Sequence, residues 1–270
     1  MATMRSSDFF ANHPVFTRDE YLAAHAVRGE RSSRTVDSLL RQHAIRGAIL
    51  HVRRGLYASV PAGATADTFL VDPFLVATKL APNAAVAYHA ALQFRGKAYS
   101  LWSRFAVLTE GLRHTVEFQG NTFVSVRPQP KLNGMRDLAS GIVTEPHAGG
   151  LVRVTTFERT LVDILDHPDR GGGCEEAWRS LEMVEYFDLD AVVDYALRLG
   201  SALTVARIGF FLDQHRDALF VEDDHLKALR AHAPRQPSYF DRKRESGHLV
   251  KQWNLIVPER LLNRTWAEVS

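Results

Sequence analysis

The chain of 270 residues contains one cysteine, Cys174, and no run of 18 or more apolar residues. A single cysteine cannot form an internal disulfide framework, and such scarcity is typical of a protein from a reducing compartment. A membrane-spanning helix needs a longer apolar run than any found here. The N-terminal segment also lacks the apolar core of a signal peptide. These absences predict a cytoplasmic protein without a membrane partner.

The sequence also lacks the motifs that mark common catalytic sites. Gly171–Cys174 is rich in glycine, but no Gly-Lys-Ser/Thr follows it, so it is not a P-loop. Gly200-Ser201 resembles the opening of a nucleotidyltransferase motif, but the acidic pair that would hold metal does not follow, and helix capping explains the two residues better. Cys174 adjoins two glutamates rather than a cation that would lower its pKa, so we do not expect a nucleophile.

Three further residues have the chemistry of metal ligands but a simpler explanation. Asp163 and Asp166 are one helical turn apart and His167 follows them, yet a helix surface that ends in a dipole-stabilised histidine gives the same pattern. His89 lies in an apolar segment and is expected to be a hydrogen-bonded packing residue. We therefore predict no catalytic residue, no metal site and no cofactor, and a protein that is not an enzyme.

Positive charge is concentrated in one short stretch. Residues 31–54 contain one acid, Asp37, and six arginines, which gives the stretch a formal charge of +5 in a chain whose net charge is +2. A local basic patch on a nearly neutral protein is typical of a surface that binds a polyanion. The alternative is a solvated helix, because the whole chain uses 27 arginines and only 6 lysines.

The first half of Ser33–Tyr57 has the pattern of a helix with one buried and one polar face. Its apolar residues recur at helical spacing, namely Val36, Leu39, Leu40 and His43 or Ala44. At about 100° per residue, the opposite face carries Arg34, Ser38 and Arg41, with Thr35 and Gln42 beside them. Guanidinium, amide and hydroxyl groups can bind base edges and phosphates. This face is therefore a candidate for DNA recognition.

A short hairpin with two more arginines follows this helix. Ile49–Val52 and Leu56–Ser59 are β-prone runs around Arg53-Arg54-Gly55, where glycine permits a tight turn. A basic helix followed by a basic hairpin predicts a winged helix-turn-helix. The candidate DNA-binding residues are Ser33, Arg34, Thr35, Ser38, Arg41, Gln42, Arg46, Arg53, Arg54 and Tyr57.

The residues before the basic helix complete the expected winged fold. A short helix is expected over 5–13, and Thr17–Glu20 has the spacing of a capping box that begins a helix ending near Ala26. Phe16 and Tyr21 occupy the two positions of a hydrophobic staple. We predict a winged-helix domain over residues 1–62 and a linker at 63–67, where small residues predominate.

Residues 68–270 are expected to form a larger mixed domain with a small sheet and a helical C-terminal half. Asp72-Pro73 should begin a helix that ends near Leu80, and a second helix is expected over Ala84–Gln93. The β-prone runs predict a partly antiparallel sheet with strands at 105–108, 115–118, 122–126 and 151–154. Further helices are predicted at 157–165, 174–186, 190–199, 204–216 and 223–232, with a final strand in 253–257. The predicted fold class is α+β.

Several segments together resemble AbiEi-type antitoxins, the winged-helix partners in type IV abortive-infection toxin–antitoxin pairs. The resemblance covers nearly the whole chain and is carried by FTRDEYLAA, SSRTVDSLLRQHAIRGAILHVRRGLYAS, VTTFERTLVDIL, LDAVVDYALRLGS and KQWNLIV. It implies an N-terminal domain that binds double-stranded operator DNA and represses its own operon. It also implies a C-terminal domain that neutralises a cognate nucleotidyltransferase-like toxin, with or without a stable complex.

Three hypotheses for the function follow. The first is a DNA-binding antitoxin and autorepressor, with DNA binding in residues 1–62 and toxin neutralisation in residues 68–270. The second is a DNA- or nucleotide-processing enzyme that the winged helix tethers to DNA, and an ordered acidic group in a cleft would favour it. The third is a protein-interaction module, which absent or salt-independent DNA binding would favour. The lack of catalytic spacing favours the first.

Overall fold

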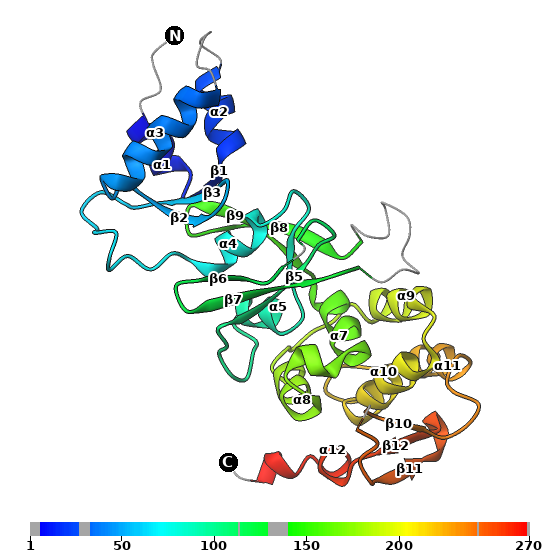
Figure 1. Ribbon diagram of the computed structural model, residues 1–270. Coiled ribbons are helices and arrows are strands. Elements are labelled where there is room, and N and C mark those ends of the chain that lie inside the picture. Colours follow the sequence, from blue (N-terminus) through cyan, green and yellow to red (C-terminus); the bar gives the residue numbers. More distant parts are fainter. Residues whose placement is uncertain (1–5, 27–32, 113, 129–139, 242, 269–270) are drawn as a thin grey trace. The chain divides into compact units, whose positions relative to one another are not determined.

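The computed structural model describes residues 6–26, 33–112, 114–128, 140–241 and 243–268. The fold is α+β, as predicted, with the helices and strands labelled in Figure 1. The chain forms two compact units. Unit 1 comprises residues 1–86, 103–127 and 143–154, and unit 2 comprises residues 87–102, 128–142 and 155–270. The segment 63–67, expected as a linker, lies inside unit 1, so the winged helix and the sheet that follows it share one unit.

Unit 1 begins with the element order of a winged helix-turn-helix. Helices α1 (Ser6–Asn12), α2 (Arg18–Ala26) and α3 (Ser33–Ile45) are combined with strands β1 (Val15–Thr17), β2 (Ile49–Arg53) and β3 (Leu56–Ser59). The strands form an antiparallel sheet in the order β1-β3-β2 (Figure 1). In this sheet Phe16 pairs with Tyr57, and Leu50 pairs with Ala58. The predicted helices and the predicted hairpin are confirmed.

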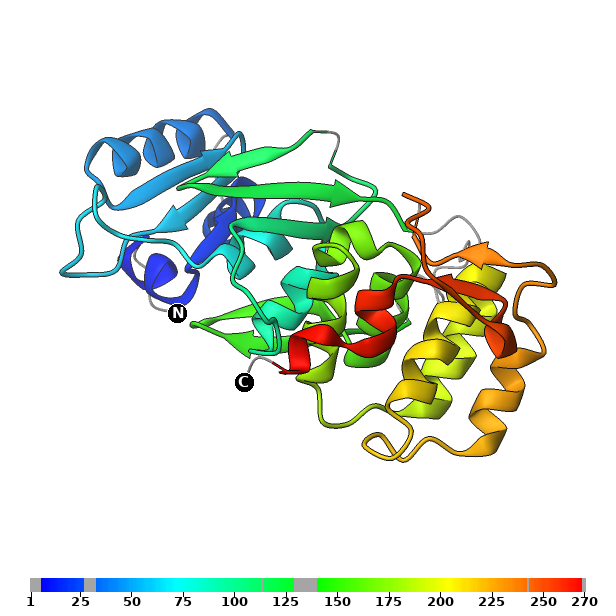
Figure 2. The same ribbon diagram turned by 90° about the horizontal axis from the view of Figure 1, so that it is seen from below.

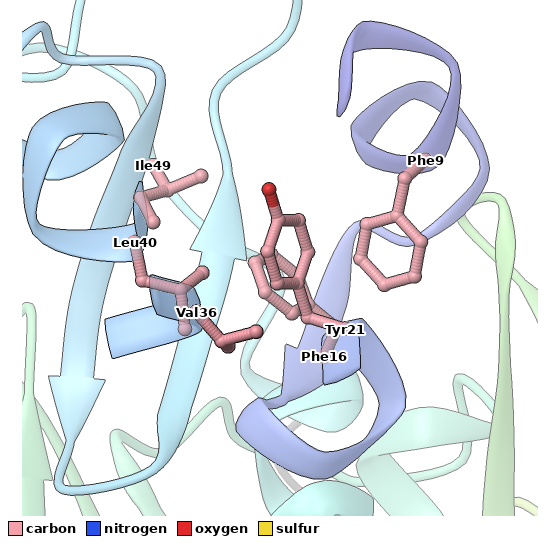
Figure 3. Close-up of a cluster of buried hydrophobic side chains, with 6 residues drawn as sticks. All are labelled: Phe9, Phe16, Tyr21, Val36, Leu40 and Ile49. Carbon is pink, nitrogen blue, oxygen red and sulfur yellow. The ribbon is translucent and has the colours of Figure 1, made fainter. Parts of the chain in front are cut away.

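One buried apolar cluster holds these elements together. It consists of Phe9, Phe16, Tyr21, Val36, Leu40 and Ile49, which come from all three helices and from β1 and β2. Figure 3 shows Phe16 and Tyr21 between Phe9 on one side and the α3 residues on the other. The ring of Phe9 meets those of Phe16 and Tyr21 edge to face, with centroids 5.1 Å and 5.2 Å away, which is a favourable aromatic geometry. Each large side chain buried here contributes roughly 1.5–3 kcal/mol.

The predicted capping box begins α2. The backbone N–H of Thr17 donates to Glu20 Oε2 at 2.7 Å, and the backbone N–H of Glu20 donates to Thr17 Oγ1 at 3.2 Å. The rings of Phe16 and Tyr21 lie 6.0 Å apart, as expected for the hydrophobic staple. Burial alone would raise the pKa of Glu20, but hydrogen bonds from Lys79 and from the backbone of Thr17 outweigh it and lower that pKa.

The rest of unit 1 is a helix and a mixed sheet. Helix α4 (Pro73–Lys79) begins at Asp72, whose side chain accepts hydrogen bonds from the backbone N–H groups of Phe74 and Leu75. The sheet has the strand order β6-β7-β5-β4-β9-β8. Its strands are β4 (Ala85–Ala87), β5 (Arg104–Leu108), β6 (Val116–Phe118), β7 (Asn121–Val126), β8 (Ile142–His147) and β9 (Gly150–Thr155). Helix α4 packs against both β1 and β5 and so joins the winged helix to this sheet.

The prediction of a helix over Ala84–Gln93 is wrong in its first half. Ala85–Ala87 is instead strand β4, which pairs in parallel with β9 at Val86 and Val154. Its three residues are completely buried, and the periodicity of so short an apolar run cannot distinguish a helix from a strand. Helix α5 (His89–Phe94) begins only after Tyr88, whose φ of 56° turns the chain. The sheet is also larger than expected, because the sequence predicts neither β4 nor β8.

Unit 2 is mainly helical, as predicted. Besides α5, it contains α7 (Phe157–Asp166), α8 (Cys174–Glu182), α9 (Leu189–Leu199), α10 (Ala202–Gln214), α11 (Asp223–Arg230) and α12 (Glu259–Asn263). Helix α10 packs against α7, α9 and α11, and α9–α11 lie side by side in both views (Figures 1 and 2). A small sheet has the order β10-β12-β11, formed by β10 (Ser238–Tyr239), β11 (His248–Val250) and the expected final strand β12 (Leu255–Val257). None of the helices in the described ranges is long and apolar enough to cross a membrane.

Loss of the capping hydroxyl should weaken the winged helix. We expect Thr17→Ala to lower the free energy of unfolding by about 1 kcal/mol, the usual contribution of an N-cap side chain. Thr17→Ser keeps the hydroxyl and should stay close to wild type. Urea denaturation followed by circular dichroism measures both variants. Equal stability of the two would show that the cap contributes nothing.

Candidate nucleic-acid interface

Helix α3 buries one side and exposes the other. Val36 and Leu40 are completely buried, whereas Leu39, His43 and Ala44 are half-buried, which confirms the predicted stripe. The exposed side chains in the described part of the helix are Thr35, Asp37, Ser38, Arg41, Gln42 and Ile45. Four of these are candidate DNA-binding residues and reach solvent as expected. Ser33 and Arg34 form the first turn of α3, but their side chains lie outside the described part of the structure.

A salt bridge that the sequence does not reveal connects α2 with α3. Arg18 Nε lies 2.5 Å from Asp37 Oδ1, and Arg18 Nη2 lies 3.1 Å from Asp37 Oδ2, so the guanidinium group donates two parallel hydrogen bonds. This contact lowers the pKa of Asp37 and raises that of Arg18. Asp37 is the one acid of residues 31–54. Asp37 thus pairs with an arginine from outside that stretch.

Strands β2 and β3 and the turn between them form the wing, residues 49–59, and Arg54 lies in its exposed turn. Gly55 follows with a φ of 78°, and a Cβ at this position would meet no other described residue within 4 Å. The left-handed backbone, rather than crowding, therefore favours glycine here. The carbonyl group of Gly55 accepts a hydrogen bond of 2.9 Å from the backbone N–H of Arg18. Arg18 thus contacts α3 through its side chain and the wing through its backbone.

Arg53 and Tyr57, two predicted DNA-binding residues, make contacts within unit 1. Arg53 is half-buried, and its Nη2 donates to the backbone carbonyl group of Leu80. The half-buried ring of Tyr57 stacks on Phe16, with centroids 5.8 Å apart, and lies 5.5 Å from the ring of His51. Burial raises the pKa of Tyr57. Both side chains therefore have structural contacts, in contrast to the exposed Arg54.

Three exposed arginines are available to an anionic ligand. Arg41 lies on α3, Arg46 lies in the turn that follows it, and Arg54 lies on the wing. Within the described ranges, none of the three forms an ion pair with a carboxylate. Such guanidinium groups can bind phosphate oxygens or the edge of guanine in bidentate fashion. With Ser38 and Gln42 on the same helix, this surface can both hold a phosphate backbone and contact base edges.

The carboxylates of unit 2 that suggested a metal site have other partners. Asp163 is buried, where its Oδ2 lies 3.3 Å from Nε of Arg159 and its Oδ1 accepts a hydrogen bond of 2.9 Å from the hydroxyl of Tyr195. Burial raises the pKa of Asp163. Asp166 Oδ2 lies 3.3 Å from Nε2 of His167. In the part of the chain that the structure describes, no group of three or more His, Cys, Asp and Glu side chains is arranged to bind a metal ion.

His89 and Cys174 are both buried. His89 Nε2 lies 3.0 Å from Glu176 Oε1, and its ring stacks on Trp102 with centroids 4.1 Å apart, as expected of a packing residue. Burial lowers the pKa of His89. Cys174 lines a cavity of about 420 Å³ at the start of α8, and burial raises the pKa of its thiol to about 11. A thiol with so high a pKa is a poor nucleophile at neutral pH.

Comparison with solved structures supports the fold. The crystal structure of the RV2827C protein from Mycobacterium tuberculosis matches 98% of this chain and 94% of its own chain, with a TM-score of 0.57 and 18% sequence identity. At this identity the likeness establishes a similar fold and nothing further. No family model matches the chain, and none of the curated proteins does.

The Arg18–Asp37 pair allows a charge test of the α3 surface. Asp37→Asn removes one negative charge, Arg18→Gln removes one positive charge, and the double variant restores the net charge of the wild type. If duplex DNA binds here, affinity for random duplex should rise in Asp37→Asn, fall in Arg18→Gln and return toward wild type in the double variant. Fluorescence anisotropy at low salt measures this order. The same affinity in all four proteins would place any bound DNA elsewhere.

Proposed function

We propose that this protein binds double-stranded DNA, with α3 as the recognition helix and the β2–β3 turn as the wing. The observation that carries the proposal is a helix face with an exposed arginine, followed by an exposed arginine on the wing, while the neighbouring acid is already paired with Arg18. Arg41 would contact bases and Arg54 would contact the phosphate backbone. This division follows the geometry of winged helix-turn-helix proteins, which place one helix in the major groove.

The size of α3 suits this role. Its 13 residues correspond to a length of about 20 Å at a rise of 1.5 Å per residue, and the major groove of B-DNA is wide enough to admit a helix. A merely solvated helix would expose arginine as well. Unlike simple solvation, DNA recognition requires the hydrogen-bonding side chains of Ser38, Arg41 and Gln42 to contribute together to one binding surface.

We further propose that the protein is a cytoplasmic antitoxin and autorepressor of a type IV toxin–antitoxin operon. The support is the resemblance to AbiEi-type antitoxins, which runs from the winged helix to the segment at 251–257. On this proposal residues 1–62 bind operator DNA, and residues 68–270 neutralise a nucleotidyltransferase-like toxin. Lys79 pairs with Glu20 and α4 packs against β1, so cutting the chain at 63–67 would break contacts inside unit 1. Point variants of the full chain are therefore the better test.

Neighbouring arginines of the wing should differ in their effect on DNA binding. The logarithm of the affinity should fall with the logarithm of the salt concentration by roughly 0.9 per phosphate neutralised. Arg54→Gln should make this slope less steep by about 0.9, because one phosphate contact is lost. Arg53→Gln should leave the slope unchanged, because the Arg53 side chain donates to the carbonyl group of Leu80. A gel-shift series across salt concentrations measures both slopes.

If Arg54→Gln leaves the salt dependence of the affinity unchanged, Arg54 of the wing makes no phosphate contact. A flat salt response of the wild type would count against the whole proposed DNA surface, and would favour a protein-interaction module instead.

Repression and toxin neutralisation should be separable in the full chain. In cells that carry the toxin gene and a reporter under the operon promoter, Arg41→Ala combined with Arg54→Ala should abolish repression and still rescue growth. The reason is that both arginines lie on the proposed DNA surface, whereas neutralisation is assigned to residues 68–270. The matched control is Arg53→Gln, which should retain both activities. Loss of growth rescue in the double variant, at normal protein abundance, would place neutralisation in the winged helix.

A further inference from the structure

Ile45 is an unusual member of the exposed stripe of α3. It is the last residue of the helix, and 77% of its surface is exposed. Ser38, Arg41, Gln42 and Ile45 follow the spacing i, i+3, i+4 and i+7, so they share one stripe of the helix. That stripe lies opposite the buried side formed by Val36 and Leu40. Ile45 therefore lies on the same face as the polar side chains proposed to contact DNA.

The chemistry of Ile45 differs from that of the rest of this stripe. Ser38, Arg41 and Gln42 can donate hydrogen bonds, but the side chain of Ile45 cannot bind a phosphate or the polar edge of a base. The apolar group that the four bases display in the major groove is the C5-methyl group of thymine. We propose that Ile45 contacts a thymine methyl group in the bound duplex and selects for thymine at one position. This inference rests on the proposed function, because it requires α3 to lie in the major groove.

The helix geometry also limits where this thymine lies. Ile45 follows Arg41 by four residues, which is about 6 Å along the helix axis. Successive base pairs rise by about 3.4 Å along the duplex. The selected thymine should therefore lie within about two base pairs of the base that Arg41 contacts. Thymine selectivity farther away would not come from Ile45.

The test removes the methyl group and changes nothing else. Sites bound by the full-length protein are selected from a pool of random duplexes, and each thymine of one selected site is then replaced in turn by deoxyuridine. Dissociation constants are measured for the wild type and for Ile45→Ala. Leu70→Ala is the matched control, because Leu70 is an aliphatic residue of unit 1 that is 78% exposed and lies outside α3 and the wing.

The wild type should lose about fourfold in affinity at one thymine, the factor expected for burial of one methyl group. Ile45→Ala should bind the thymine and deoxyuridine duplexes equally at that position, and Leu70→Ala should behave like the wild type. The inference is overturned if the wild type tolerates every replacement, or if Ile45→Ala loses as much as the wild type. Either result would leave DNA binding itself intact. A wild type that binds duplex DNA without sequence preference also overturns the inference, and a wild type that binds no duplex overturns the proposed function as well.

Discussion

The buried cluster around Phe16 and Tyr21 is the constraint on which the proposed DNA surface depends. Val36 and Leu40 insert into it from α3, and each large apolar side chain buried there contributes roughly 1.5–3 kcal/mol. Because helical side chains have a fixed angular spacing, burial of these two residues forces the stripe from Ser38 to Ile45 to face solvent. Apolar packing therefore sets the direction in which the polar face points, and the exposure of its charged side chains follows from that packing.

Arg18 adds an ion pair between α2 and α3 to this apolar packing. Its side chain pairs with Asp37 on α3, and its backbone N–H donates to Gly55 on the wing. One residue therefore contacts both elements that are proposed to contact DNA. An exposed ion pair of this kind contributes little to folding stability in general. Its larger effect here is on the charge of the surface, because it neutralises the acid that lies among the arginines.

Local sequence patterns predicted many elements of this fold well, because α3, the hairpin and the capping box of α2 are each specified by residues close in sequence. They failed for β4, where Ala85–Ala87 is a short and completely buried run that fits either a helix or a strand. The site was predicted only in part. The sequence does not distinguish Arg53 from Arg54, and their different roles follow from the hydrogen bond that the Arg53 side chain donates to the carbonyl group of Leu80. The partner of Asp37 lies 19 positions away, beyond the reach of any local pattern.

The α3 surface and the wing together form the proposed DNA interface. Hydrogen–deuterium exchange of the full chain, with and without a selected duplex, can locate the interface because it reports on every peptide at once. Peptides covering residues 33–59 should exchange more slowly when DNA is bound, with little change in peptides covering α8–α11. Protection confined to α8–α11, with residues 33–59 unchanged, would contradict it.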